Sequence, residues 1–171
     1  GETARQIGIL VHACLQDLRC DERSAARVYA QREAYRAWFT ARGVPLEQLD
    51  TAVARVTEAL LAVLEDEKGR WILAEYPAHD ARELALSANL GGRVTNIVLD
   101  RTFVHQGERW VIDYKTSHHG GGQLESFLQS ELERYDDQLR RYARIAARLG
   151  PEPVRVGLYF PLMRAFREWR G

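Results

Sequence analysis

Residues 94–117 read Val94-Thr-Asn-Ile-Val-Leu-Asp100-Arg-Thr-Phe-Val104, then His105-Gln-Gly-Glu108, then Arg109-Trp-Val-Ile-Asp113-Tyr-Lys115-Thr-Ser117. Two runs rich in β-branched and aromatic residues flank a short stretch that contains glycine. This pattern predicts a β-hairpin. If Val104 pairs with Arg109, the same register places Asp100 directly opposite Asp113. A two-residue loop and a four-residue loop both give this register.

Two carboxylates that face each other across a ladder repel, so the pair is favourable when a cation lies between them. Lys115 is two residues beyond Asp113, so its side chain is expected to leave the same face of the strand. Two carboxylates and an amine that meet at one point are typical of a metal-dependent phosphodiester hydrolase. An Asp-x-Lys tripeptide on an exposed strand is more often a solvated ion pair, and this alternative has to be weighed.

Two features favour the site over the solvated pair. The residues around Asp113 are apolar on both faces of the strand, so the strand is expected to be buried and its charges need a partner. Lysine is also rare, because only Lys68 and Lys115 are lysines among 24 basic residues. The choice of lysine suggests that a compact point charge is required at position 115, where arginine would differ in shape and hydration.

The hairpin resembles the core of the PD-(D/E)XK nuclease superfamily. More narrowly, it is similar to the RecB-like nuclease domain at the C-terminus of UvrD-type helicase-nucleases, the RecB and AddA group. Further segments resemble motifs of that family in the expected order: Gly8-Ile-Leu-Val-His12, Arg82-Glu83-Leu-Ala-Leu-Ser87, Arg134-Tyr-Asp-Asp-Gln138-Leu-Arg-Arg-Tyr142 and Gly157-Leu-Tyr-Phe-Pro-Leu162. One departure is that Asn96 and Val98 stand where the family usually has a glycine.

The resemblance implies a Mg²⁺ or Mn²⁺ site and assigns its residues. Asp100 and Asp113 would bind the metal together with His12, the main-chain carbonyl of Tyr114 and Glu83. For Glu83 a solvated position at a sheet edge is an equal alternative, and Glu75 on a predicted preceding strand competes for the role. A lone histidine is more often a half-buried residue with one backbone hydrogen bond.

Lys115 would orient the attacking water and offset the charge that develops on the phosphate. Gln138 and Tyr142 are four residues apart and share one helix face, where the resemblance places them beside the active site. Arg141, Arg144 and Arg148 form a stripe that could follow a DNA backbone. A charged stripe on a helix is more often a solvated face.

Composition sets limits on the partners. The formal net charge is zero, so no global basic field favours nucleic acid. No transmembrane segment or signal peptide is visible, which leads us to expect a cytoplasmic protein without a membrane partner. The two cysteines, Cys14 and Cys20, cannot hold a cluster alone, so no iron–sulfur cluster is expected.

The fold expected is α/β, a restriction-endonuclease-like core with a mixed central sheet flanked by helices and a helical N-terminal extension. Residues 1–171 are expected to form one nuclease domain, with a helical part over about 1–70 and a core over about 71–171. The elements expected are helices over 6–18, 24–42, 46–67 and 124–149, strands over 71–77, 82–88 and 154–161, and the hairpin. A start at Gly1, just before a motif that is internal in the relatives, suggests a C-terminal fragment of a longer helicase-nuclease.

The function expected is that of a metal-dependent deoxyribonuclease, an exonuclease of the RecB-like type. The resemblance implies single-stranded DNA delivered by a helicase during double-strand-break repair and recombination. It implies as partners the helicase portion of the same polypeptide and a second helicase-nuclease subunit. One alternative is a catalytically inactive DNA-binding or scaffolding module. Another is a stand-alone structure-specific endonuclease or resolvase, which would act as a dimer.

Overall fold

The computed structural model describes all 171 residues, Gly1–Gly171. The chain forms two compact units. The first, a helical unit, comprises residues 1–74, 115–118 and 160–165. The second, an α/β unit, comprises residues 75–114, 119–159 and 166–171. No helix in the structure has both the length and the apolarity needed to span a membrane.

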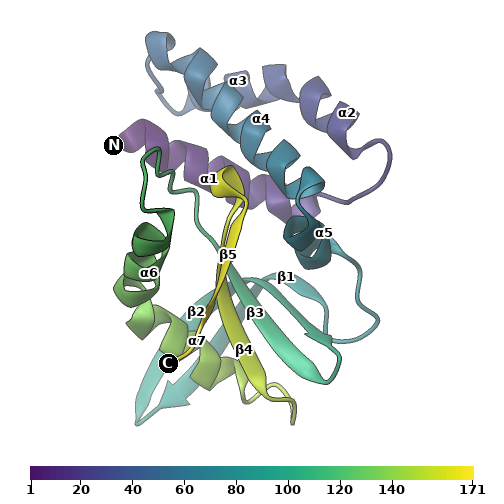
Figure 1. Cartoon of the computed structure of the whole chain (residues 1–171), viewed down its shortest axis with the longest axis vertical. Helices are drawn as coiled ribbons and strands as arrows, with labels where there is room; N and C mark the ends of the chain where they lie inside the picture. The colour runs from purple at the N-terminus through teal and green to yellow at the C-terminus, as the bar shows by residue number, and fades with distance from the viewer. The chain divides into compact units, whose positions relative to one another are not determined.

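The helical unit is organised around one long helix, α4, against which the other helices pack (Figure 1). One face of α4 is buried in this unit, since Val56 and Val63 are inaccessible to solvent and Leu60 is almost so. The helices are α1 (Glu2–Asp17), α2 (Ser24–Ala30), α3 (Arg32–Ala41), α4 (Leu49–Glu65) and α5 (Glu67–Leu73), with the 3₁₀ turns η1 (Leu46–Gln48) and η2 (Pro161–Met163).

Two predictions for this unit are wrong. The single helix expected over 24–42 is two helices, because the chain breaks at Gln31 between α2 and α3. The strand expected over 71–77 is absent, since Trp71, Ile72 and Leu73 form the last turn of α5. Ile72 and Leu73 are buried. A short apolar run fits a buried helix turn as well as a buried strand, and here tertiary packing selects the helix.

The α/β unit contains a five-stranded mixed sheet with the order β1-β2-β3-β4-β5. Its strands are β1 (Ala81–Leu90), β2 (Arg93–His105), β3 (Glu108–Tyr114), β4 (Val154–Phe160) and β5 (Ala165–Trp169). The pairs β1–β2 and β2–β3 are antiparallel, whereas β3 and β4 are parallel. The predicted α/β class, with a mixed sheet flanked by helices after a helical N-terminal part, is confirmed.

The hairpin closes as the sequence predicts. Val104 pairs with Arg109, and His105 pairs with Glu108 across a two-residue loop. The loop residues Gln106 and Gly107 both have positive φ, +51° and +76°. This backbone twist matches that of the flanking strands and explains the glycine at the second loop position.

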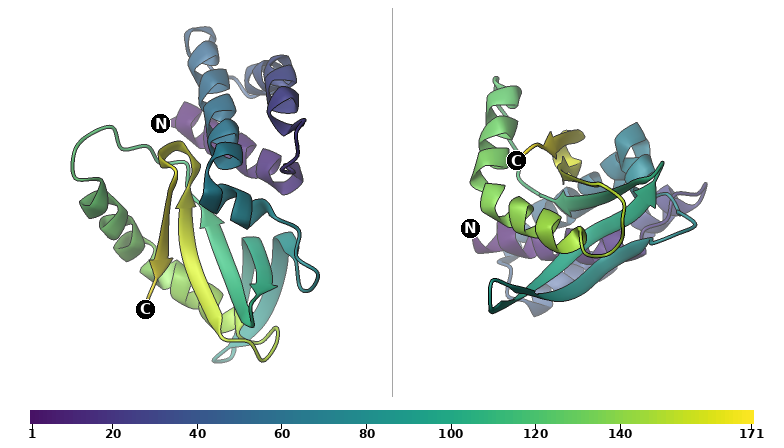
Figure 2. Two further views of the ribbon diagram at one scale, coloured as in Figure 1. Left: turned by 45° about the vertical axis from the view of Figure 1, so that its right-hand side comes forward. Right: turned by 90° about the horizontal axis from the view of Figure 1, so that it is seen from below.

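The parallel connection from β3 to β4 carries two helices, α6 (Leu124–Arg134) and α7 (Asp136–Ala146). Figure 2 shows them along one face of the sheet. The single helix predicted over 124–149 is therefore wrong, since the chain breaks at Tyr135. Strand β5 was not predicted either. It follows a turn in which Arg164 takes a φ of +47°, a conformation without the usual glycine signal.

Candidate functional site

The register of the sheet brings two carboxylates together. Arg101 pairs with Ile112, so the next position along β2 and β3 places Asp100 opposite Asp113. Directly opposed residues have their side chains on the same face of a sheet. Asp113 is buried, with 5% of its surface exposed, and Asp100 is half-buried.

A backbone hydrogen bond fixes one of these carboxylates. The Tyr114 amide N–H donates to Oδ2 of Asp100 over 2.9 Å, at the end of β3. The phenol of Tyr114 is buried, and this burial raises its pKa. Two carboxylates on the same face at opposed positions, one of them buried, repel unless positive charge lies between them.

Gln138 and Tyr142 lie on one face of α7, as the four-residue spacing predicts. Nε2 of Gln138 donates to the Tyr142 hydroxyl oxygen over 3.0 Å. Burial, followed by the negative charges of Asp113 and Asp100, raises the pKa of Tyr142 to about 12. The phenol therefore lies within electrostatic reach of both carboxylates and is protonated at neutral pH. Oε1 of Gln138 is buried and accepts no hydrogen bond.

His12 and Lys115 belong to the helical unit. Nδ1 of His12 lies 2.9 Å from the Gly8 carbonyl oxygen one turn earlier in α1. If Nδ1 carries the proton, it donates this bond and leaves the Nε2 lone pair for a metal ion, the usual arrangement of ligating histidines. Lys115 directly follows the last residue of β3.

Residues 1–166 match the family model described as the PD-(D/E)XK nuclease superfamily. The chain belongs to the PD-(D/E)XK nuclease superfamily. The α/β architecture is consistent with the restriction-endonuclease-like fold of that superfamily, whose members are generally nucleases that act on DNA and typically use divalent metal ions. A search of curated proteins found no match to the chain.

Glu83 occupies the β1 position next to Asp100, and we call Glu83, Asp100 and Asp113 the acidic row of this PD-(D/E)XK domain. The pairs Arg82–Arg101 and Leu84–Leu99 bracket a position where Glu83 would face Asp100, and the regular ladder is interrupted there. Glu83 is exposed and has a φ of +54°. A left-handed conformation costs a non-glycine residue roughly 1–2 kcal/mol and occurs preferentially at functional positions. Glu75 lies in the segment after α5, not on the strand that was expected for it.

The donor set of the α/β unit suits a hard divalent cation. Carboxylate oxygens are the ligands that Mg²⁺ prefers, and Mn²⁺ accepts them equally. No group of three or more His, Cys, Asp or Glu side chains is arranged to hold a metal ion. The feature that fits a cation is therefore limited to two side chains, the opposed carboxylates of Asp100 and of buried Asp113.

The three arginines of the predicted stripe, Arg141, Arg144 and Arg148, are all exposed. Nη1 of Arg148 donates to the Asn89 carbonyl oxygen over 3.1 Å, which ties the end of the α7 region to β1. Arg141 directly precedes Tyr142 in α7.

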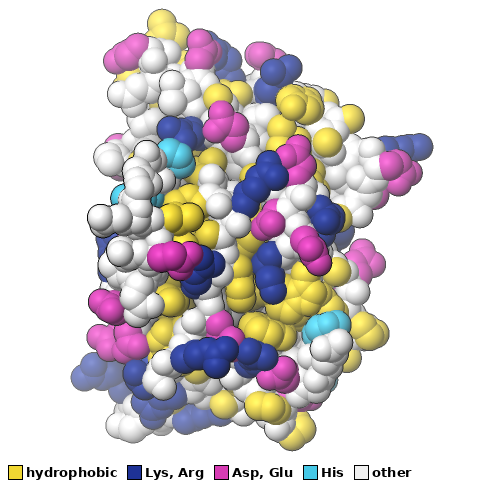
Figure 3. Space-filling model, in the orientation of Figure 1, with side chains coloured by type: hydrophobic (Ala, Val, Ile, Leu, Met, Phe, Trp, Pro, Cys, Tyr) yellow, Lys and Arg dark blue, Asp and Glu magenta, His cyan; other side chains and the backbone are white.

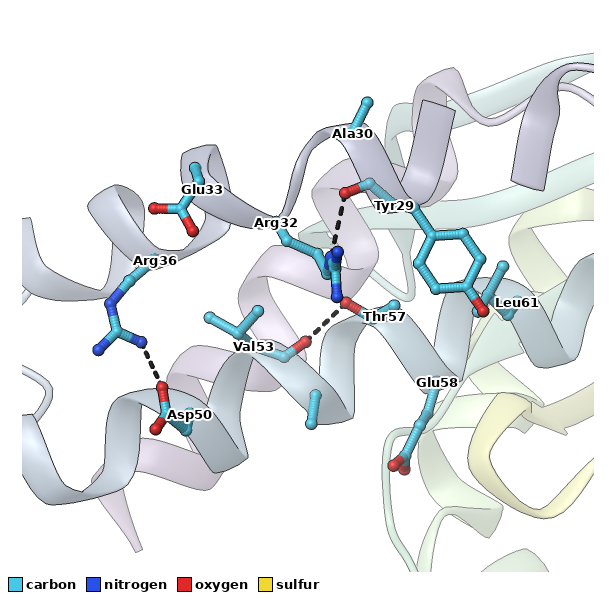
Figure 4. A pocket seen from close by; sticks show the side chains of 11 residues that line it. Tyr29, Ala30, Arg32, Glu33, Arg36, Asp50, Val53, Thr57, Glu58 and Leu61 are labelled. Carbon is cyan, nitrogen blue, oxygen red and sulfur yellow. Dashed lines mark hydrogen bonds and ion pairs between the residues drawn. The ribbon is translucent and has the colours of Figure 1, made fainter. Parts of the chain in front are cut away.

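The helical unit contains an open cleft of about 540 Å³ between α2, α3 and α4. Figure 4 shows Arg36 paired with Asp50 at one end, 2.5 Å apart, and Tyr29 with Arg32 in the middle. None of the residues predicted for the site lines this cleft. Its mixed charges show no preference for either sign of ligand.

Thr116, to which the sequence assigns no role, packs against α1. A Cβ added to Gly8 would lie 3.0 Å from the Thr116 hydroxyl oxygen. The segment directly after Lys115 therefore approaches the helix backbone closely one turn before His12. The glycine four residues before His12 is the signal that could have revealed this contact.

Gly8→Ala should bring no gain in stability while Thr116 is present. Alanine is favoured over glycine inside a helix by about 1 kcal/mol, but the close contact with the hydroxyl opposes this gain. In a Thr116→Ala background the same change should raise the free energy of unfolding by about that amount. Urea unfolding of the four proteins measures the coupling. An equal gain in both backgrounds would show that α1 and Thr116 do not touch.

Proposed function

We propose that this PD-(D/E)XK domain is a metal-dependent deoxyribonuclease that hydrolyses phosphodiester bonds. The observation that carries the proposal is the opposed pair Asp100–Asp113, with the protonated phenol of Tyr142 in electrostatic reach of both. Facing carboxylates are unfavourable in a sheet unless they hold a cation. The superfamily supplies the substrate class, DNA.

The metal would be Mg²⁺ or Mn²⁺, held by Asp100 and Asp113 with Glu83, His12 and the Tyr114 carbonyl as further ligands. When bound, such an ion lowers the pKa of a coordinated water and polarises a phosphate oxygen. The orphaned amide oxygen of Gln138 supports the assignment, because a buried acceptor next to the Tyr142 phenol suits a water or another N–H or O–H donor.

The remaining roles in catalysis would fall to side chains that do not bind the metal. Lys115 would orient the attacking water and offset negative charge on the phosphate in the transition state. Tyr142 would donate its O–H to a phosphate oxygen, since its raised pKa keeps the proton in place at neutral pH. Gln138 would hold the phenol in position through the bond between its Nε2 and the hydroxyl oxygen.

The resemblance to RecB-like domains supports a finer proposal. The substrate would be single-stranded DNA delivered by a helicase during double-strand-break repair and recombination, and cleavage would be exonucleolytic. Residues 1–171 would then act as one nuclease domain within a longer cytoplasmic helicase-nuclease. Arg141, Arg144 and Arg148 would contact the DNA backbone.

Degradation of end-labelled single-stranded DNA tests the activity. We expect cleavage with Mg²⁺ or Mn²⁺ and none with EDTA. A ladder of products that shortens from one end indicates an exonuclease. If the purified domain binds no metal and cleaves no DNA, the catalytically inactive binding or scaffolding module is the better account.

Tyr142→Phe should lower the cleavage rate roughly 10- to 100-fold, somewhat less than the loss of a donor in an oxyanion hole. Because Tyr142 stays protonated up to about pH 12, the loss should be the same at every pH from 6 to 9. If the rate of the natural domain falls with rising pH below pH 9 and the rate of the variant does not, the phenol does not act in its protonated form.

The same substitution tests the pKa itself. The folded-state pKa of Tyr142 lies above the unfolded value of about 10. Its contribution to stability is therefore complete below pH 10 and is lost as the pH rises toward 12. Urea unfolding between pH 9 and 11 should show that the phenylalanine variant loses less stability than the natural chain. Equal losses of stability in the two proteins would show that the Tyr142 phenol is exposed to water.

A further inference from the structure

The face of the sheet that carries Asp100 remains open over β1 and β2. Three directly opposed pairs occupy this face beyond the acidic row. All six residues are exposed. We call this surface the β1–β2 strip; its pairs are Ala85–Val98, Ser87–Asn96 and Asn89–Val94.

The strip is long and narrow, and one of its ends is the acidic row. Glu83 and Asn89 are six residue steps apart along β1, which corresponds to about 20 Å of strand. Two strands about 4.8 Å apart give a surface about 10 Å wide. A polymer laid along the strip from its far end would therefore reach Asp100 and Asp113 end-on.

The chemistry of the strip suits a chain of alternating apolar and polar groups. It carries no charged side chain, so nothing on it repels phosphate. Val94 and Val98 keep 69% and 41% of their surface exposed. The Ser87 hydroxyl donates to Oδ1 of Asn96 over 2.6 Å, which leaves both N–H groups of the Asn96 amide for a ligand.

Positive charge borders the strip on one side. The bond from Arg148 to the Asn89 carbonyl shows that this side of α7 faces β1. Arg141 lies seven residues, or about two helical turns, earlier on the same side, directly before Tyr142. Figure 3 shows Lys and Arg side chains close together over the region where α7 lies in Figure 1. The strip thus has an uncharged floor, formed by its three residue pairs, and a basic wall on one side, formed by Arg141, Arg144 and Arg148.

We propose that the β1–β2 strip is the track for a single nucleic-acid strand that feeds the Asp100–Asp113 pair. This inference rests on the proposed function and specifies its substrate path. Phosphates would lie along Arg141, Arg144 and Arg148, and bases or sugars would lie on Val94 and Val98. Single strands bind along basic grooves that follow their phosphates, while their bases lie on neighbouring side chains. A duplex hides its bases, so the exposed valines would gain nothing from it.

The test is fluorescence anisotropy with a labelled 20-nucleotide oligothymidylate in EDTA, where cleavage cannot occur. Val98→Glu puts a carboxylate on the floor and should weaken binding at least about tenfold. Val98→Thr keeps the size and the branching and should bind like the natural chain. A Val98→Glu protein that binds as tightly as the natural one overturns the track, and it leaves the strip to a protein partner.

The wall is tested by the salt dependence of binding. Arg141→Gln with Arg148→Gln should reduce the slope of log K against log salt by about 1.4, at about 0.7 for each phosphate contact on a single strand. Arg140→Gln is the matched control. Arg140 pairs with Asp136 and lies over the Trp169 ring of β5, so its slope should not change. An unchanged slope in the double variant, or equal affinity for a duplex of the same length, overturns the proposal.

These outcomes are separable from the fate of the proposed function. If the domain binds the oligonucleotide through the strip but cleaves no DNA with metal, the proposed nuclease activity is wrong and the proposed binding track stands. If Val98→Glu cleaves single strands with the kcat/KM of the natural domain, the proposed binding track is wrong and the nuclease activity stands.

Discussion

Asp113→Asn should reduce metal-dependent cleavage by at least about 10³-fold and leave the domain folded. The loss follows from the metal chemistry, because the remaining carboxylate of Asp100 would bind a divalent ion too weakly to activate water. The free energy of unfolding, in contrast, should not fall. Neutralising one of two facing carboxylates removes a repulsion worth roughly 0.2–1 kcal/mol, so without metal the variant should be at least as stable as the natural chain.

Thermal unfolding with and without Mn²⁺ separates these effects. The natural domain should be stabilised by about 2.7 kcal/mol when the free ion is at 100 times its Kd, whereas Asp113→Asn should gain nothing at that concentration. Asp137→Asn, an exposed acid one residue before Gln138, is the matched control and should behave like the natural chain. Equal stabilisation of both aspartate variants would remove Asp113 from the metal site.

Lys115→Ala should lower the rate by roughly 10²–10³-fold, the usual cost of losing a donor aimed at developing charge. Metal binding should persist, because the amine is not a ligand. Lys115→Arg should restore less than a tenth of the natural rate if a compact point charge is required, since a guanidinium differs in shape and hydration.

Lys68 provides the control, since it is the only other lysine of the chain. Its ammonium lies 4.5 Å from the Trp71 ring centroid in α5. Lys68→Ala should leave cleavage unchanged. Natural activity in Lys115→Ala would mean that the Asp-x-Lys tripeptide is a solvated ion pair and has no part in catalysis.

The hairpin that decides the fold was predictable because two local signals agree. Two runs rich in β-branched and aromatic residues flank a short turn that contains glycine, and pairing Val104 with Arg109 across this turn sets the register in which Asp100 faces Asp113. The spacing of Gln138 and Tyr142 likewise predicts their shared face, and the hydrogen bond between them bears this out.

Other features depend on tertiary packing that no local pattern reports. Trp71–Leu73 is an apolar run that suits a strand, yet it continues the helical unit as α5. The left-handed backbone of Glu83 within β1 has no signal, because glutamate does not favour that conformation. Gly8 within α1 signals a close approach, but its partner Thr116 lies more than a hundred positions away and no local pattern identifies it.

The central claim is that Asp100 and Asp113 hold a divalent metal ion together. Isothermal titration calorimetry with MnCl₂ on the natural domain and on Asp113→Asn tests it most directly. The account predicts saturable binding by the natural domain and a loss of most of that affinity in the variant. Binding of equal affinity and stoichiometry by both proteins, or none by the natural domain, would contradict it.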